Sequence, residues 1–208
     1  HIGLIPKLSK DGFQGPIYST VGTQEFSEPM LYDSAHIQKE DEAFIARHHI
    51  PNAFKGKIPL YDDRDVAKSL KQFTGKPYEK SFQVTDDISC EFFDAGHVFG
   101  SALSVLTIKT SIGRKTLVYT GDLGRNNIPI IRDPFLIGKA DYLIIESTYG
   151  DREHERVAEI NADLQAVVMR TIRRGGKIFI PAFALERTQE VILRLEELGF
   201  GPLDEVGD

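Results

Sequence analysis

The sequence predicts an α/β fold in which helices flank a block of strands. Apolar residues recur with helical spacing between residues 23 and 48 and again between 62 and 73, but the period changes to two after residue 77. A nearly continuous apolar run at 141–146 (DYLIIE) indicates a strand that is covered on both faces. Strands flanked by helices point to a layered α/β sandwich.

The first 60 residues predict one short strand and one long helix after an opening turn. Ile2–Leu8 indicates one or two helical turns, which we expect Pro6 and the turn at 10–12 (KDG) to stop. Residues 16–20 (PIYST) predict a short apolar strand. The long helix begins near Thr23, has an acidic face that points to solvent, and ends near His48.

A second helix is predicted at 62–73, before the block of strands. Asp62 or Asp63 can cap its first turn, and Gly75 can stop it. Four strands of period two follow, at 81–85, 88–93, 102–110 and 115–120. Cys90 falls in one of these strands, where we expect a plain core or edge thiol.

The pattern changes again after Gly150. A long helix is predicted at 156–174, a strand at 177–181 and a further helix at 184–198. The buried stripe of the first of these helices would comprise Ile160, Leu164, Val167, Val168 and Ile172. Helix, strand and helix in this order indicate the start of a second α/β unit with a parallel crossover, and therefore a domain boundary near residues 146–151.

Composition limits the classes of partner. The net charge of −6 over 208 residues argues against a globally basic nucleic-acid binder, although a local basic groove can coexist with it. The short pairs Arg114-Lys115 and Arg173-Arg174 are expected to be solvated ends. A single cysteine forbids an internal disulfide and suits a reducing compartment, so we expect a cytoplasmic protein. No apolar run approaches the roughly 20 residues of a membrane span.

Two glycine-flanked loops carry the candidate chemistry. His97 lies in residues 94–102 (DAGHVFGSA) and Asp122 in 119–124 (YTGDLG), each directly after a predicted strand. With His1, they offer two imidazoles and one carboxylate, which are metal-ligand types. The plainer alternative is that His97 is a satisfied loop histidine and Asp122 forms a turn.

Several motifs occur in one order along nearly the whole chain. They are PMLYDSAHIQ (29–38), DAGHVFGSA, YTGDLG, ESTYG (146–150), and IPAFA (180–184) followed by RTQE (187–190). This order resembles that of the metallo-β-lactamase-fold RNA hydrolases of the β-CASP group, which includes the cleavage-and-polyadenylation endonuclease and the ribonuclease J-like enzymes. The resemblance implies an incomplete metallo-β-lactamase-type αββα sandwich at 1–147, followed by the start of a β-CASP α/β unit at 148–208.

The resemblance also implies a zinc-dependent ribonuclease. Two zinc ions would be held by His1, His97 and a bridging Asp122, and the hydroxide between the two metals would attack phosphorus. Asp122 and Glu146 would then be the catalytic residues, with Glu146 sharing a proton with a histidine outside this chain. Glu146 has the alternative of capping the turn that follows its strand.

Four residues are candidates for contact with substrate: Ser101, Thr148, His154 and Arg187. Hydroxyls beside glycines are also common turn chemistry, and His154 has the alternative of a surface position. Arg187 lies next to a predicted helix N-terminus, which suits a phosphate, but its pairing with Glu186 or Glu190 is an equal alternative.

The chain departs from the family pattern at both ends. The first metal motif of the family is HxHxDH, and this chain begins at its last histidine and stops before the later motifs. We therefore expect an internal fragment that is inactive alone. For the intact protein the expected substrate is single-stranded RNA. A homodimer is one possible oligomeric state. The alternatives are a small-molecule hydrolase of the same fold and a non-catalytic scaffold paralogue.

Overall fold

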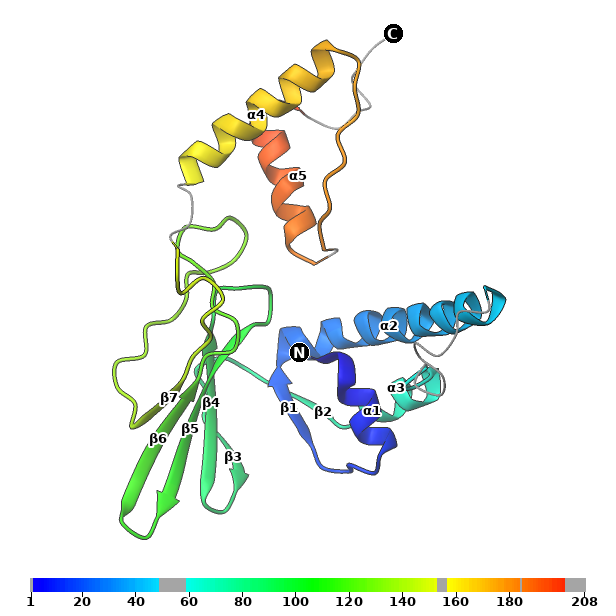
Figure 1. Cartoon of the computed structure of the whole chain (residues 1–208). Helices are drawn as coiled ribbons and strands as arrows, with labels where there is room; N and C mark the ends of the chain where they lie inside the picture. Colours follow the sequence, from blue (N-terminus) through cyan, green and yellow to red (C-terminus); the bar gives the residue numbers. More distant parts are fainter. Residues whose placement is uncertain (1, 49–58, 153–156, 184, 201–208) are drawn as a thin grey trace. The chain divides into compact units, whose positions relative to one another are not determined.

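A computed structural model describes residues 2–48, 59–152, 157–183 and 185–200 (Figure 1). Its helices and strands confirm a mixed α/β fold, and the specific αββα sandwich stays a prediction. Contacts divide the chain into two compact units, His1–Phe92 and Phe93–Asp208. The domain boundary at residue 147 rests on motifs rather than on contacts, and it also stays a prediction.

The first unit opens with a short 3-10 helix, η1 (Ile2–Leu4), that leads directly into α1 (Ile5–Lys10). The helix ends at the predicted turn of residues 10–12, but the expectation that Pro6 also stops it was wrong. Pro6 lies in the first turn of α1, where the missing N–H would have no partner within the helix, so proline favours the start rather than the end. The helix closes at Asp11, whose backbone N–H donates to the Lys7 carbonyl oxygen at 2.9 Å.

The expected long helix is confirmed as α2 (Val21–Arg47). It follows the predicted short strand, β1 (Ile17–Thr20), without an intervening loop. The turn from strand to helix is stabilised by Thr20, whose hydroxyl accepts a hydrogen bond from the Thr23 backbone N–H at 3.1 Å.

The second helix, α3 (Asp63–Leu70), starts as predicted but ends earlier. Asp62 caps it in a reciprocal capping box with Asp65. The expectation that Gly75 stops this helix was wrong. Gly75 lies inside β2 (Phe73–Lys76), a short strand that pairs in parallel with β1 and that the sequence pattern missed. A Cβ at Gly75 would meet the Gln24 side chain at 2.4 Å, so close packing explains the glycine.

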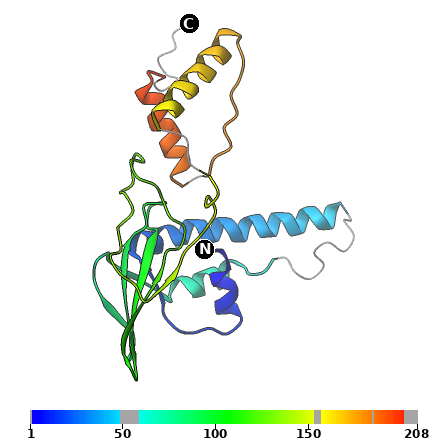
Figure 2. The ribbon, with the colours of Figure 1, turned by 60° about the vertical axis from the view of Figure 1, so that its left-hand side comes forward.

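The core of the first unit lies between these elements. Its buried members are Leu31, Ala35, Tyr61, Val66 and Phe73. The Tyr61 hydroxyl, which is inaccessible to solvent, donates to the Gly3 carbonyl oxygen at 2.8 Å and lies 2.8 Å from Ser34 Oγ. Both ribbon views show α1 and α3 side by side (Figures 1 and 2).

Strand β3 (Phe82–Thr85) pairs antiparallel with β4 (Ile88–Asp94), close to the predicted bounds. The rings of Phe82 and Phe92 pack at 5.2 Å between centroids. Cys90 on β4 is buried, as expected for a core thiol, and burial raises its pKa to about 11. Its thiolate, the reactive form, is therefore scarce at neutral pH.

In the second unit, β5 (Ala102–Thr110) and β6 (Gly113–Tyr119) form the predicted antiparallel hairpin. Strand β7 (Tyr142–Ile144) pairs with β6 in parallel. The expectation that this apolar strand is covered on both faces was wrong for the described residues, because all three of its side chains are more than half exposed. A continuous apolar run indicates that a strand can be buried, but it cannot show which layer covers it.

Helices α4 (Val157–Arg173) and α5 (Arg187–Glu197) lie side by side in both ribbon views (Figures 1 and 2). Val168 is buried on α4, but Val167 and Ile172 of the predicted stripe are exposed. The predicted strand at 177–181 was wrong, because these residues are in no strand. A strand needs a hydrogen-bonded neighbour, and an apolar run does not supply one.

A buried ion pair within α5 is hydrogen-bonded to α4. Arg194 donates from Nε and Nη2 to Glu190 Oε1 at 3.0 and 2.8 Å, and from Nη1 to Asn161 Oδ1 on α4 at 2.6 Å. The side chains of Glu190 and Arg194 are each 5% exposed. None of the helices among the described residues is both long and apolar enough to span a membrane.

Candidate active site

His97 lies on a loop that the chain folds tightly after β4. The Asp94 carboxylate accepts a hydrogen bond from the Gly96 N–H at 2.9 Å, and Gly96 takes a left-handed φ of 62°. The Ser101 hydroxyl oxygen then accepts the backbone N–H groups of His97 and Val98 at 3.1 and 3.2 Å. These contacts fix the loop backbone on both sides of the His97 imidazole.

Asp122 lies on the turn after β6, and this turn packs directly against the His97 loop. The Gly124 N–H donates to the Ala95 carbonyl oxygen at 2.9 Å. A Cβ at Gly124 would lie only 1.5 Å from the Gly96 carbonyl oxygen. The two loops therefore approach backbone to backbone, and only glycine fits at residue 124.

This approach brings the two predicted ligands together, although 25 residues separate them in sequence. His97 Nε2 lies 3.8 Å from Asp122 Oδ2, and both side chains are 41% exposed. Two donors that each lie about 2.0–2.2 Å from one zinc ion can be no more than about 4.4 Å apart, so this pair fits a shared ion. No group of three or more metal-ligating side chains occurs among the described residues, and His1 lies outside them. The structure thus brings two of the three predicted ligands close together, and metal binding by them stays a prediction.

Glu146 follows β7 and holds the turn that carries Asp122. Its Oε1 accepts the Leu123 backbone N–H at 2.5 Å. Hydrogen bonds from the Thr148 hydroxyl and from the Leu123 N–H lower the pKa of the Glu146 carboxyl, against the opposing effects of partial burial and of the Asp122 charge. Glu146 therefore caps the turn after its own strand through Thr148, as in the plainer alternative, and it also holds the Asp122 turn through Leu123.

We expect removal of this carboxylate to loosen the Asp122 turn. A hydrogen bond to a charged group contributes about 1.5–3 kcal/mol, so Glu146→Ala should raise the amide exchange rate of Leu123 by about tenfold or more. Glu146→Gln retains a neutral acceptor and should fall between the parent and the alanine variant. Hydrogen exchange followed by NMR measures both. Unchanged protection of Leu123 in the alanine variant would mean that other contacts hold the turn.

The two hydroxyl candidates for substrate contact are engaged within the protein. Ser101 accepts two loop N–H groups, and the Thr148 hydroxyl donates to Glu146. Ser101 thus stabilises the loop that carries His97, and Thr148 holds the Glu146 side chain next to the Asp122 turn. Direct contact with substrate stays a prediction for each of them.

Arg187 pairs with a carboxylate, which was the equal alternative to phosphate binding. Its Nη1 lies 2.5 Å from Glu190 Oε2. The N-cap position of α5 is occupied by Glu186, which is 8% exposed and has a left-handed φ of 67°. Burial raises the pKa of Glu186, while the nearby charges of Arg187 and His97 act in the opposite direction. The sequence indicates Glu186 only as a partner for Arg187, and nothing in it signals that His97 lies near enough to affect the Glu186 pKa.

His154, the remaining substrate candidate, lies outside the described residues. His36 lies on the exposed surface of α2, 3.3 Å from Glu40. The described part of the site therefore consists of His97, Asp122 and Glu146, on the loops that follow β4, β6 and β7.

Comparison with curated proteins finds relatives along nearly the whole chain. Ribonuclease TTHA0252 of Thermus thermophilus is 33% identical over 92% of this chain, and the transcription termination factor FttA of Methanosarcina mazei is 35% identical over 95%. RNase aCSPSF2 of Saccharolobus solfataricus is 29% identical over 96%. No family model matches the sequence.

These relatives confirm the resemblance that the motifs indicated. The chain is related to the metallo-β-lactamase-fold RNA hydrolases of the β-CASP group. It spans 39%, 29% and 37% of the lengths of the three relatives, respectively.

Proposed function

We propose that these residues are part of a zinc-dependent ribonuclease that hydrolyses phosphodiester bonds in single-stranded RNA. The observation that carries the proposal is the 3.8 Å approach of His97 to Asp122 on two loops of motifs shared with RNA hydrolases. Two relatives that are named ribonucleases support the reaction class.

The roles follow from the positions of the side chains. His97 Nε2 and Asp122 Oδ2 would hold metal, together with His1 and with ligands from outside the chain. Bound zinc would supply a Lewis acid for the phosphoryl oxygen and lower the pKa of a water molecule. The Gly96–Gly124 contact fixes the distance between the two ligand loops, and Glu146 fixes the Asp122 turn. Glu146 is thus a positioning residue in this proposal.

The test is cleavage of a labelled single-stranded RNA by the full-length protein. Activity should disappear after chelation and return with added zinc. His97→Ala should lower both zinc content and cleavage, whereas His36→Ala, at an exposed position on α2, should change neither. A thioester and a lactone are included as substrates for the small-molecule alternative. Hydrolysis of either without RNA cleavage would refute a ribonuclease, and no hydrolysis by a zinc-loaded protein would favour the scaffold alternative.

A further inference from the structure

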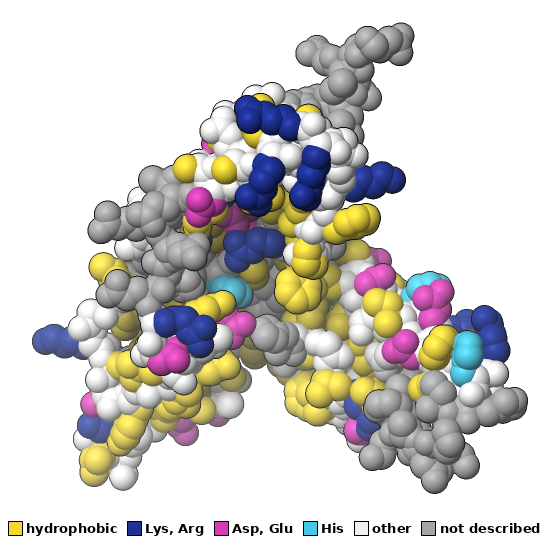
Figure 3. All heavy atoms as spheres, turned by 45° about the horizontal axis from the view of Figure 1, so that its top comes forward, with side chains coloured by type: hydrophobic (Ala, Val, Ile, Leu, Met, Phe, Trp, Pro, Cys, Tyr) yellow, Lys and Arg dark blue, Asp and Glu magenta, His cyan; other side chains and the backbone are white. Residues whose placement is uncertain are grey.

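The C-terminal end of α4 and the residue that follows it carry a cluster of arginines that the proposed active site does not use. Arg170, Arg173 and Arg174 line an open hollow of about 670 Å³, together with Gln165 and a floor of Ala162, Ala166 and Met169. The space-filling view shows dark blue side chains gathered over the region of α4 and α5 (Figure 3). We define these three residues as the arginine cluster.

The arginine cluster is not neutralised within the described part of the chain. All three side chains are exposed, and among the described residues none of them forms an ion pair. This contrasts with Arg187 and Arg194 on α5, which both pair with Glu190. Three guanidinium groups within five residues, without a carboxylate partner in the part of the chain that the structure describes, stand out in a chain with a net charge of −6. Favourable interaction with the C-terminal dipole of α4 accounts for basic residues in its last turn, but it leaves their guanidinium groups free to bind.

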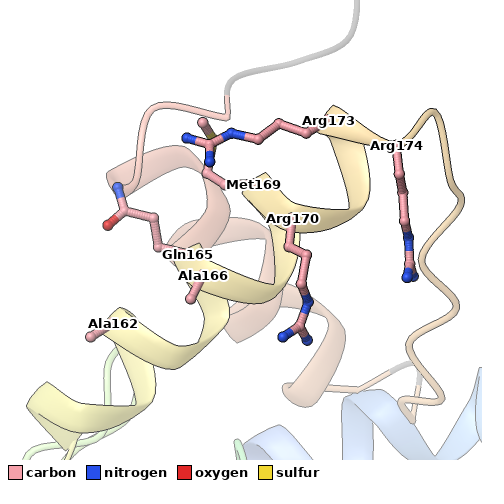
Figure 4. Close-up of a pocket in the computed structure, with 7 residues that line it drawn as sticks. All are labelled: Ala162, Gln165, Ala166, Met169, Arg170, Arg173 and Arg174. Carbon is pink, nitrogen blue, oxygen red and sulfur yellow. The ribbon is translucent and has the colours of Figure 1, made fainter.

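The directions of the side chains indicate the shape of the ligand. Arg173 extends over Met169 toward the side on which Gln165 lies, whereas Arg170 and Arg174 extend away from it (Figure 4). Residues three and four apart have Cβ atoms about 5–6 Å apart, and here the guanidinium groups diverge further. The groups do not converge on one point, so they do not form a site for a single small anion. They suit a chain of negative charges that crosses the helix.

We infer that the arginine cluster binds the phosphate backbone of RNA at a site on α4. Guanidinium groups pair with phosphate oxygens through two parallel hydrogen bonds, and the apolar floor offers contact area to a ribose or a base. The inference rests on the proposed function for the identity of the polyanion. The expected solvated helix end is confirmed, since Arg173 and Arg174 are exposed at the end of α4, and the inference adds a ligand to it.

The experiment measures RNA affinity as a function of salt. The full-length protein carries Asp122→Asn to prevent cleavage, and it is compared with the same protein carrying Arg170→Gln, Arg173→Gln and Arg174→Gln. Glutamine has a helix propensity similar to that of arginine, so α4 should persist, and circular dichroism checks this. Each lost phosphate contact on a single strand reduces the slope of log affinity against log salt by about 0.7. The slope of the triple variant should therefore be smaller by about 2, and its affinity for RNA should fall by about tenfold or more.

Matched variants separate a site from a general charge effect. Lys39→Gln, Arg47→Gln and Arg64→Gln remove the same charge from exposed positions on α2 and α3 and should retain the parental affinity. Lysine in place of all three arginines should keep most of the salt dependence. Equal losses in the two glutamine triple variants, or no loss in the α4 variant, would overturn the inference. Displacement of RNA by polyglutamate at equal charge concentration would reassign the cluster to an acidic protein partner. These binding results do not depend on cleavage. If the arginine cluster proves necessary for RNA binding but the parent protein does not cleave RNA, only the proposed function is refuted.

Discussion

Asp122→Asn should lower RNA cleavage by the full-length protein by about a hundredfold or more. Metal ions contribute several kcal/mol of transition-state stabilisation in such sites, and about 1.4 kcal/mol corresponds to tenfold in rate. A neutral amide is a poor substitute for the Asp122 carboxylate, which lies 3.8 Å from His97 Nε2. The fold should persist, because asparagine has the same shape and tolerates the same turn. Cleavage of labelled RNA and zinc content measure the two effects.

The matched control is Asp41→Asn, which removes an identical charge from an exposed position on α2. It should leave cleavage unchanged. RNA binding by Asp122→Asn should fall much less than cleavage, because long-range charge and backbone contacts supply most of the affinity. Parental rates of cleavage in Asp122→Asn would reduce Asp122 to a turn residue and remove the basis of the proposed mechanism.

Arg194→Gln should destabilise the α4–α5 pair by about 3–5 kcal/mol, the range observed when one partner of a buried ion pair is removed. The substitution leaves the Glu190 carboxylate buried with a weaker partner, and it also removes the hydrogen bond to Asn161. Thermal unfolding followed by circular dichroism measures the loss. Because Arg194 also donates the hydrogen bond that links α5 to α4, we expect helical signal to be lost at a lower temperature than in the parent.

Arg187→Gln provides a sharp comparison, since Arg187 pairs with the same carboxylate. Its side chain is 55% exposed, so the substitution should cost about 1 kcal/mol or less. The difference between the two variants tests burial rather than the number of hydrogen bonds. Equal costs would show that Glu190 is solvated in the folded protein.

The sequence predicted most elements because their signals are local. Asp62 marks the start of α3 through its own hydrogen bonds, and the alternation in β5 and β6 is visible in the residues themselves. The errors concern properties that depend on distant partners. Strand β2 exists because β1 lies beside it, and residues 177–181 lack such a partner among the described strands.

The candidate site was predictable to a similar degree. Glycine-flanked loops at strand ends identified His97 and Asp122, and the structure brings them to 3.8 Å. The hydrogen bond from Leu123 to Glu146 was not predictable, since it joins two loops through a backbone group that leaves no trace in the sequence. The pairing of Arg187 required the helical spacing of Glu190, which the sequence had offered as one of two alternatives.

The contact between Gly96 and Gly124 has a consequence for how this region can change over generations. Because the two backbones touch, a side chain at residue 124 would have to be accompanied by movement of the whole 94–102 loop. A sequence with a side chain at residue 124 could keep the residues of both loops, but the loops would move apart and His97 would lie farther from Asp122. Glycine at residue 124 is therefore a marker for sorting related sequences: those with a larger residue there cannot hold the two loops at the distance seen in this chain, even if both His97 and Asp122 are retained.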